Sequence, residues 1–84
     1  NGDYRIKGIT ELEQLNEDLN TQFEADDVET VAGLVIQHLG RVPKFGERVR
    51  VNDFEFEVQR ADPRQVHILL MRRIVPNSNS PTEA

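Results

Sequence analysis

Apolar and polar residues alternate at the start of the chain, which predicts a half-buried β-strand over residues 4–9. Tyr4 and Ile6 fall on one side of this segment, and Arg5 and Lys7 fall on the other. Successive side chains of a strand point to opposite faces, so one face can pack on a core while the other meets solvent.

The spacing of apolar residues then changes to a helical period, which predicts a helix over residues 11–19. Three leucines at intervals of three and four residues form a narrow apolar stripe, with acidic residues outside it. Thr10 and Glu13 have capping-box spacing, in which the hydroxyl accepts from one amide and the carboxylate reaches back to another. We therefore expect Thr10 to cap this helix.

A second helical segment runs up to Leu39, and its apolar residues spread round much of its circumference. This distribution predicts the most buried element of the domain. Either Asp26 or Asp27 can cap its start, and Asp26 with Glu29 repeats the capping-box spacing. Gly33 lowers helix stability by about 1 kcal/mol relative to alanine, so we expect a strand or another helix to approach it closely.

Glycine and proline then mark a turn-rich loop. Gly40 suits the left-handed conformation that ends a helix, Pro43 prevents the helix from resuming, and Gly46 continues the turn. Phe45, next to Lys44 in this loop, is either a core plug or an exposed anchor for a partner. We favour the buried position, because so short a chain has a thin core.

From residue 49 onward the apolar period is two, which predicts three strands in an antiparallel meander. Asn52-Asp53 has the chemistry of a tight hairpin turn, and Pro63 lies in the next turn. The last strand is apolar on both faces, so we expect it inside the sheet. The expected fold is α+β: a strand, two helices, then a three-stranded antiparallel meander, with the helices packed on one sheet face.

The second face of the last strand is a candidate interface. Leu69 and Met71 alternate with Ile68 and Leu70. If the helices cover only one sheet face, Leu69 and Met71 form an exposed apolar patch on the other, where the preceding domains or a second copy would bind through this strand. Together with Phe45, these two residues are the candidate interface.

Length and composition bound the domain organisation. The chain has 84 residues, of which 37% are apolar and 30% charged, values typical of one small globular domain. We expect residues 1–75 to form this domain and residues 76–84, which offer nothing to bury, to be a disordered tail. No apolar run is long enough for a membrane span. The start at Asn1 instead of Met indicates a piece of a longer protein.

Charge and residue types exclude several classes of function. The net charge is −5 and most of the acidity lies in the helical half, so we expect no nucleic-acid binding. The absence of Cys excludes disulfides, thiolate zinc sites and cysteine nucleophiles. His38 and His67 have structural explanations, and the only serines lie in the predicted tail, so we expect no catalytic residues and no enzyme activity.

Asp26, Asp27 and Glu29 form the one carboxylate cluster that could hold a divalent cation. Their spacing matches no calcium loop, and capping of the second helix accounts for the same residues. We therefore expect no metal site, with these three residues as the weak candidates. The chain also lacks a Gly-rich strand-to-helix turn and a Gly-Lys-Ser/Thr element, the loops that bind phosphates.

Several segments resemble the CorC/HlyC transporter-associated domain over about residues 2–74. The most specific are the Thr-Val-Ala-Gly-Leu-Val run from Thr30 to Val35 and the Leu-Gly-Arg-Val-Pro run from Leu39 to Pro43. The glycines and the proline of these runs and of the following turn are the structural motif of the resemblance: Gly33, Gly40, Pro43 and Gly46.

The resemblance implies a non-catalytic accessory domain of a magnesium and cobalt efflux protein, where it follows a pair of CBS domains and modulates ion transport. The CBS domains are the implied partners. Some family members carry a membrane domain ahead of them, so membrane association would come through the parent protein. The implied location is the cytoplasm or the cytoplasmic face of the inner membrane.

The family is also similar in fold to part of the PCMH-type, FAD-binding superfamily. A flavin adenine dinucleotide or nucleotide-binding module is therefore the alternative function, and a weakly active hydrolase is a third. Likeness of fold does not establish a site, and no pyrophosphate loop is present, so we expect no cofactor, with FAD supported by fold analogy only.

Overall fold

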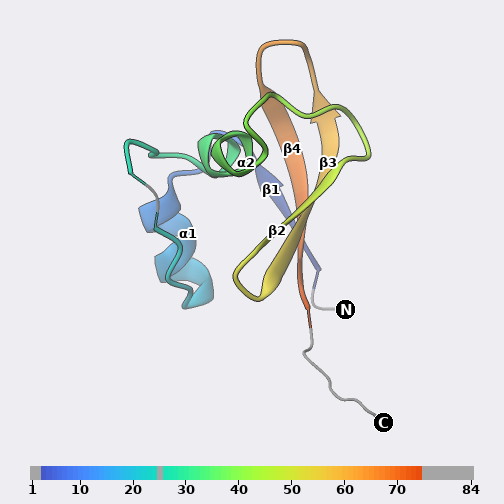
Figure 1. The fold of residues 1–84 in the computed structure, drawn as a ribbon. Helices are drawn as coiled ribbons and strands as arrows, with labels where there is room; N and C mark the ends of the chain where they lie inside the picture. Colours follow the sequence, from blue (N-terminus) through green and yellow to red (C-terminus); the bar gives the residue numbers. More distant parts are fainter. Residues whose placement is uncertain (1–2, 25, 75–84) are drawn as a thin grey trace, which may run out of the picture.

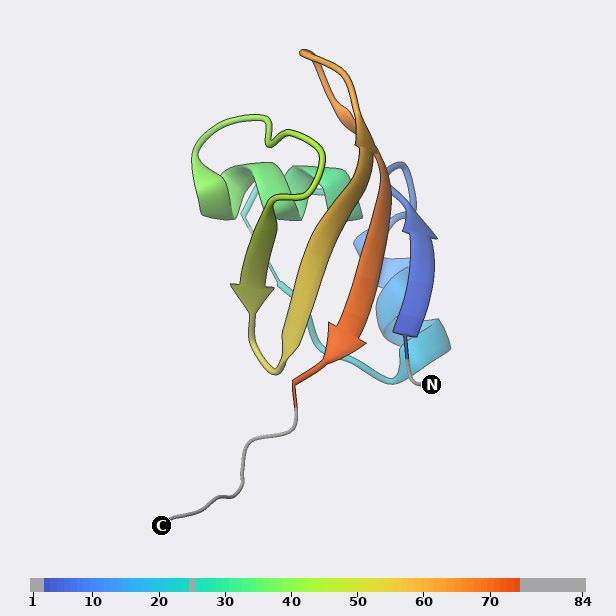
Figure 2. The ribbon, with the colours of Figure 1, turned by 90° about the vertical axis from the view of Figure 1, so that its right-hand side faces the viewer.

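A four-stranded antiparallel sheet lies against two helices in the computed structural model, which describes residues 3–24 and 26–74 (Figure 1). The helices cover one sheet face and leave the other open (Figure 2). The predicted α+β class and element order are confirmed. In chain order the elements are β1 (Asp3–Lys7), α1 (Leu12–Leu19), α2 (Val31–Leu39), β2 (Arg48–Val51), β3 (Phe54–Ala61) and β4 (Val66–Arg73).

β4 lies inside the sheet, as its two apolar faces predict. The strand order is β1-β4-β3-β2, so β4 pairs with β1 on one side and with β3 on the other. Met71 lies opposite Tyr4 of β1 and Phe56 of β3. Asn52 adopts a left-handed conformation, with a φ of 56°, in the tight turn between β2 and β3. The predicted hairpin is therefore confirmed.

The β3–β4 pairing is irregular near its end, and this changes which side chains face the helices. Val58 pairs with Leu69 and Ala61 pairs with Val66, with register shifts on both sides of Arg60. Such irregularities leave extra residues unpaired and reset the alternation of side chains. As a result, Val66 and Leu69 are both buried although they are three positions apart, an odd spacing that would put them on opposite faces of a regular strand.

The start of α1 differs from the prediction, because backbone groups replace the expected side-chain cap. The helix is preceded by Glu11, which makes no capping hydrogen bond through its side chain. The Leu12 amide instead donates to the Glu29 carbonyl oxygen at 2.8 Å, beside a bridge between Glu11 and Thr30. The predicted capping box of Thr10 and Glu13 is therefore wrong, whereas the leucine stripe does face the core.

The start of α2 also differs from the prediction. The Thr30 hydroxyl caps the helix by accepting from the Gly33 amide at 3.1 Å. Asp26 and Asp27 lie in an exposed turn ahead of the helix, so neither is its cap. A Cβ at Gly33 would lie 3.1 Å from Cγ1 of Val28. The close neighbour is therefore the segment before the helix, not the strand or helix that we expected.

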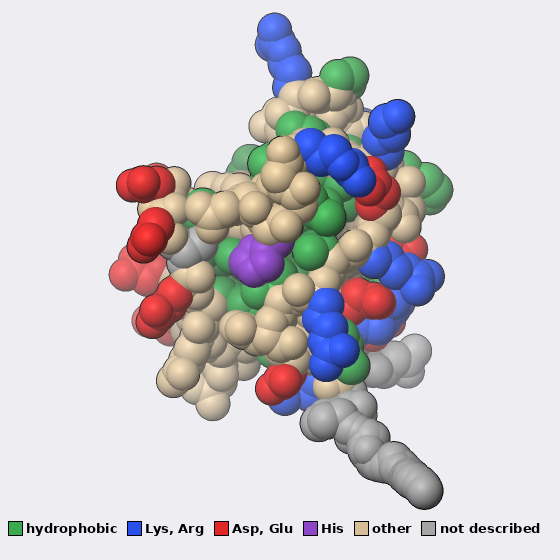
Figure 3. Space-filling view, in the orientation of Figure 1, with side chains coloured by type: hydrophobic (Ala, Val, Ile, Leu, Met, Phe, Trp, Pro, Cys, Tyr) green, Lys and Arg blue, Asp and Glu red, His purple; other side chains and the backbone are tan. Residues whose placement is uncertain are grey.

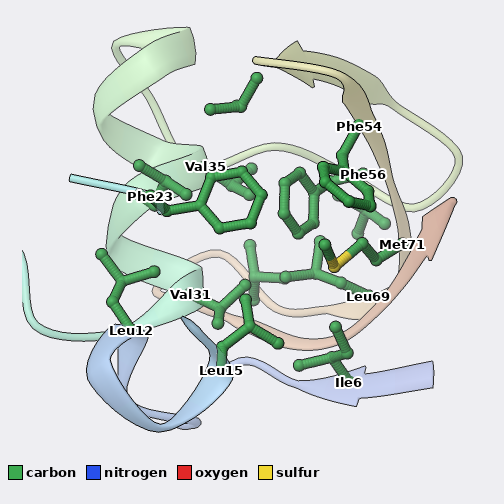
Figure 4. Packing of buried hydrophobic residues seen from close by; sticks show 14 residues of the cluster. Ile6, Leu12, Leu15, Phe23, Val31, Val35, Phe54, Phe56, Leu69 and Met71 are labelled. Carbon is green, nitrogen blue, oxygen red and sulfur yellow. The ribbon is translucent and has the colours of Figure 1, made fainter. Parts of the chain in front are cut away.

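The core lies between the helices and the sheet, and Phe23 from the α1–α2 connection fills its middle (Figure 4). Its ring centroid is 5.6 Å from that of Phe54 and 5.7 Å from that of Phe56. Asn16 fixes this segment, because its side-chain amide bonds both the backbone N–H and the carbonyl oxygen of Phe23. Phe23 therefore belongs to the core although it lies outside any helix or strand.

Candidate interaction surface

Phe45 projects from the α2–β2 loop with 75% of its surface exposed. The expectation that Phe45 plugs the core is therefore wrong, whereas Pro43, two positions earlier, is fully buried. Gly40 ends α2 with a φ of 79°, as predicted, and Gly46 has a φ of 88°. Both glycines adopt a left-handed conformation that other residues rarely take, so they fix the path of the loop.

An ion pair closes this loop. The Arg41 guanidinium donates to both carboxylate oxygens of Glu47, at 2.5 and 2.8 Å. The backbone N–H of Lys44 donates to the same carboxylate at 2.7 Å. These bonds, the Arg41 bond first, lower the pKa of Glu47 from 4.5 to about 2. The carboxylate is therefore ionised at neutral pH, and it accepts three hydrogen bonds within the loop.

Backbone hydrogen bonds join the same loop to the sheet. The Gly46 amide donates to the Val58 carbonyl oxygen at 2.8 Å, and the Val58 amide donates to the Glu47 carbonyl oxygen at 2.9 Å. Phe45 therefore lies on a loop that the Arg41–Glu47 ion pair closes and that these backbone bonds attach to β3.

An apolar groove lies between Phe45 and the β3–β4 hairpin. Its volume is about 380 Å³. Asp62 at its edge accepts hydrogen bonds from the amides of Arg64 and Gln65 and pairs with the His67 ring at 2.7 Å. These contacts, the His67 bond first, lower the pKa of Asp62. We call this site the Phe45 groove; it is lined by Val42, Pro43, Lys44, Phe45, Ala61, Asp62 and Pro63.

Leu69 and Met71 do not form an exposed patch. Both are fully buried and face the helices (Figure 4). The residues on the open sheet face are Ile68 and Leu70, which are partly buried and lie outside the core cluster. The prediction is wrong because the direction of alternation depends on the register of β4, which the register shifts near Arg60 help to set. β4 also has no free edge through which a second copy could pair, because β1 and β3 occupy both.

Ion pairs connect the strands across the open sheet face. Arg72 lies 2.9 Å from Glu55, 3.5 Å from Glu57 and 3.6 Å from Asp3. Arg48 lies 3.7 Å from Glu57. The hydrogen bond to Glu55 is the main cause of the raised pKa of Arg72. Arg72 is the centre of this network because β4 adjoins both β1 and β3, a neighbour relationship that the sequence pattern alone does not reveal.

Charge divides the molecule into an acidic helical layer and a sheet layer that carries the basic residues. Residues 8–40 contain eight Asp and Glu residues and no Lys or Arg. In Figure 3, acidic side chains gather over α1 and the connection to α2, while Lys and Arg side chains lie over the strands and their loops.

The candidate metal ligands lie at the surface ahead of α2. Asp26, Asp27 and Glu29 are exposed. Among residues 3–24 and 26–74, no group of three or more His, Asp or Glu side chains could hold a metal ion. The same part of the chain contains no helix long and apolar enough to cross a membrane. The predicted tail over 76–84 lies outside the described residues.

The profile of the transporter associated domain family, CorC_HlyC, matches residues 1–75. The chain belongs to this family. The resemblance seen in the runs that end at Val35 and Pro43 is therefore confirmed. In this CorC_HlyC domain, the second run forms the end of α2 and the beginning of the loop that presents Phe45.

A curated relative shows how much of a longer protein the CorC_HlyC domain represents. The magnesium and cobalt efflux protein CorC from Buchnera aphidicola subsp. Acyrthosiphon pisum is 32% identical over 76 residues, which cover 87% of this chain and 26% of that protein. The chain therefore spans about a quarter of the length of the curated relatives that it matches.

Solved CorC_HlyC domains share the fold. The Mg²⁺ and Co²⁺ transporter (CorC) associated region from Neisseria meningitidis MC58 is 38% identical with a TM-score of 0.83, covering 87% of this chain and 90% of that one. A domain from a Xylella fastidiosa Temecula1 hemolysin, solved in complex with Mg²⁺ and Mn²⁺, is 28% identical with a TM-score of 0.76, covering 88% and 90%. Because the solved chains are little longer than the match, such domains fold without the rest of their parent proteins.

Proposed function

We propose that this CorC_HlyC domain is a non-catalytic accessory domain that modulates a magnesium and cobalt efflux protein. The observation that carries the proposal is the match to about a quarter of proteins named CorC, the magnesium and cobalt efflux protein. A domain that is a minor part of a transporter acts through its contacts with the rest. The CBS domains of such parents are the proposed partners, and the proposed location is the cytoplasm or the cytoplasmic face of the inner membrane.

The absence of catalysis is proposed from the surroundings of the titratable residues. Nδ1 of His38 lies 3.1 Å from the Leu34 carbonyl oxygen, and the His67 ring pairs with Asp62 in an exposed turn. A general base needs a nucleophile within hydrogen-bond reach and a pocket that holds substrate. Within the described residues, neither histidine has a serine, threonine or cysteine hydrogen-bonded to it.

We also propose that the domain functions without flavin or nucleotide. Helix N-termini bind phosphate through their free amides. In α2 these amides are already used: Val31 donates to the Thr10 carbonyl oxygen, Ala32 to the Gly8 carbonyl oxygen and Gly33 to the cap. Titration of the domain with FAD and ATP, followed by calorimetry and by flavin absorbance, should show no saturable binding. Micromolar affinity with a spectral change would instead support the alternative, a flavin or nucleotide-binding module.

Removal of the domain from its parent protein tests the main proposal. Cells expressing the parent without residues 1–75 should differ from those with the intact parent in cobalt tolerance and in the rate of efflux of loaded cobalt. A parent lacking only residues 76–84 is the matched control, and immunoblots establish equal abundance. Unchanged efflux at equal abundance would contradict an accessory role in transport.

A further inference from the structure

We propose that the Phe45 groove binds an acidic segment that carries one large apolar side chain, and that this segment belongs to the part of the parent protein outside this chain. The inference rests on the proposed function, because it needs a parent protein for the domain to contact. It adds the surface that makes the contact and the chemistry that the surface recognises.

The presentation of Phe45 is the first argument. An exposed aromatic side chain on a mobile loop would lose conformational entropy on binding, whereas one on a fixed loop loses little. The Arg41–Glu47 ion pair and the bonds of Gly46 and Glu47 to Val58 hold this loop before any partner arrives. Preorganised aromatic residues at the centre of an interface are the usual source of binding energy.

The shape and lining of the groove are the second argument. Phe45 and the hairpin residues Ala61 and Pro63 form apolar walls above the buried Pro43. The volume of about 380 Å³ is near the lower end of the range for small-molecule clefts. Such a groove accepts the side chain of a leucine or phenylalanine and leaves the backbone of the bound segment at the rim.

The charge around the groove determines which residues flank the apolar side chain of the bound segment. Arg41 neutralises the Glu47 carboxylate in the same loop, whereas Asp62 on the lining pairs with the His67 ring, which is charged only if it is protonated. Lys44 on the lining and Arg64 in the adjacent turn make no ion pair within the described residues. With Asp62 counted as one negative charge and Lys44 and Arg64 as two positive charges, the groove and its adjacent turn carry a net charge of +1, so the complementary segment carries Asp or Glu beside its apolar side chain.

The position of the groove favours a protein segment over an anionic bilayer. The β1–α1 turn lies at the same end of the sheet, because Gly8 bonds His67 there, and exposed acidic residues at 11 and 13 follow it. These carboxylates would be repelled by anionic lipid. The matched segment is only 26% of the length of a CorC relative, so such relatives supply ample polypeptide outside it.

Photo-crosslinking in the full-length parent tests the inference. p-Benzoylphenylalanine replaces Phe45 in one variant and Ile9 in the control, which is equally exposed at 75% and lies outside the groove. We expect the probe at 45, but not at 9, to crosslink a peptide of the parent that contains a large apolar residue next to Asp or Glu. Adding Lys44→Glu should reduce the yield at 45 by roughly fivefold, while adding Arg5→Glu on β1 should not change it.

Four results would overturn the inference: no adduct at 45, equal adducts at 45 and 9, adducts to lipid alone, or adducts between two copies of this domain. Each is separable from the failure of the proposed function. If removal of the domain alters cobalt efflux but the probe at 45 captures no parent peptide, the accessory role stands without this surface. If the crosslink forms but removal leaves efflux unchanged, the contact exists without the proposed function.

Discussion

Gly8, in the turn after β1, lies directly against the backbone carbonyl of Val66 at the start of β4. A Cβ on Gly8 would lie 2.1 Å from the Val66 oxygen and 3.0 Å from Cβ of Ala32. The Gly8 amide also donates to the His67 carbonyl oxygen at 2.7 Å. Only glycine therefore allows β1, β4 and α2 to meet at this point.

Substitution Gly8→Ala should lower the free energy of unfolding by roughly 3 kcal/mol, because backbone must move to make room. Gly33→Ala is the matched control. Its Cβ would meet the Val28 and Thr30 side chains at 3.1 and 3.3 Å. These can adjust while helix propensity improves, so its effect should stay within about 1 kcal/mol. Urea denaturation of both variants measures the difference, and similar stabilities would contradict the packing at Gly8.

Thr30→Ala should lower the free energy of unfolding by about 1 kcal/mol, the usual effect of losing a helix N-cap. The reason is the hydrogen bond from the Gly33 amide to the Thr30 hydroxyl. Asp26→Ala serves as the control and should have little effect, since that residue is exposed and ahead of the helix. A larger loss of stability in Asp26→Ala than in Thr30→Ala would show that Asp26 is the cap.

Leu69→Ala should lower the free energy of unfolding by about 2–5 kcal/mol, as expected when a fully buried leucine leaves a cavity. Leu70→Ala, one position along β4 on the open face, should cost less than about 1 kcal/mol. Thermal and chemical denaturation distinguish the two. If the Leu69→Ala variant were as stable as the unmodified protein but differed in self-association, Leu69 would belong to the exposed patch that the sequence predicted.

The Glu47 carboxylate should make stability depend on pH. Its pKa is lowered from 4.5 to about 2 in the folded protein, so its ionised form stabilises the fold. This contribution is complete above the ordinary pKa and is lost as pH falls from 4.5 towards 2. The stability difference between the unmodified protein and Glu47→Gln should therefore shrink over that interval. If the stability difference between the two proteins instead stays constant from pH 7 to pH 2, the ion pair does not contribute to the stability of the fold.

Divalent cations should bind this domain only weakly, at millimolar concentrations. Asp26, Asp27 and Glu29 are exposed, and a closed site needs several converging oxygen ligands. Calorimetry with Mg²⁺, Co²⁺ and Mn²⁺ tests this expectation, and the Xylella fastidiosa domain solved with Mg²⁺ and Mn²⁺ makes the measurement pertinent. Micromolar saturation that disappears in Asp26→Asn or Asp27→Asn would show that these residues form a site.

Periodicity was enough to predict the helices and strands of residues 3–24 and 26–74, because most of these elements bury a regularly recurring set of apolar side chains. It could not predict the helix starts. By residue type, Thr10 could cap α1, and Asp26 or Thr30 could cap α2. Which residue caps a helix depends on contacts between segments that are distant in sequence, such as the bridge between Glu11 and Thr30.

The candidate surface was harder to predict than the elements. Register shifts near Arg60 help to decide which side of β4 faces the core, and they involve one strand relative to another. Phe45 could be assigned to the core or to the surface from sequence alone. Pro43, two residues earlier, occupies the buried position instead.

The length of the sheet gives the domain the properties of a lever arm. Asp3 pairs with Arg72 at one end of the sheet. The α2–β2 loop, which carries Phe45, lies at the other end (Figure 2). β3 has eight residues, so the arm is roughly 26 Å long at about 3.3 Å per residue. A rotation of about 10° around the Asp3 end would move Phe45 by roughly 4–5 Å, a displacement larger than the distance over which two side chains stay in van der Waals contact.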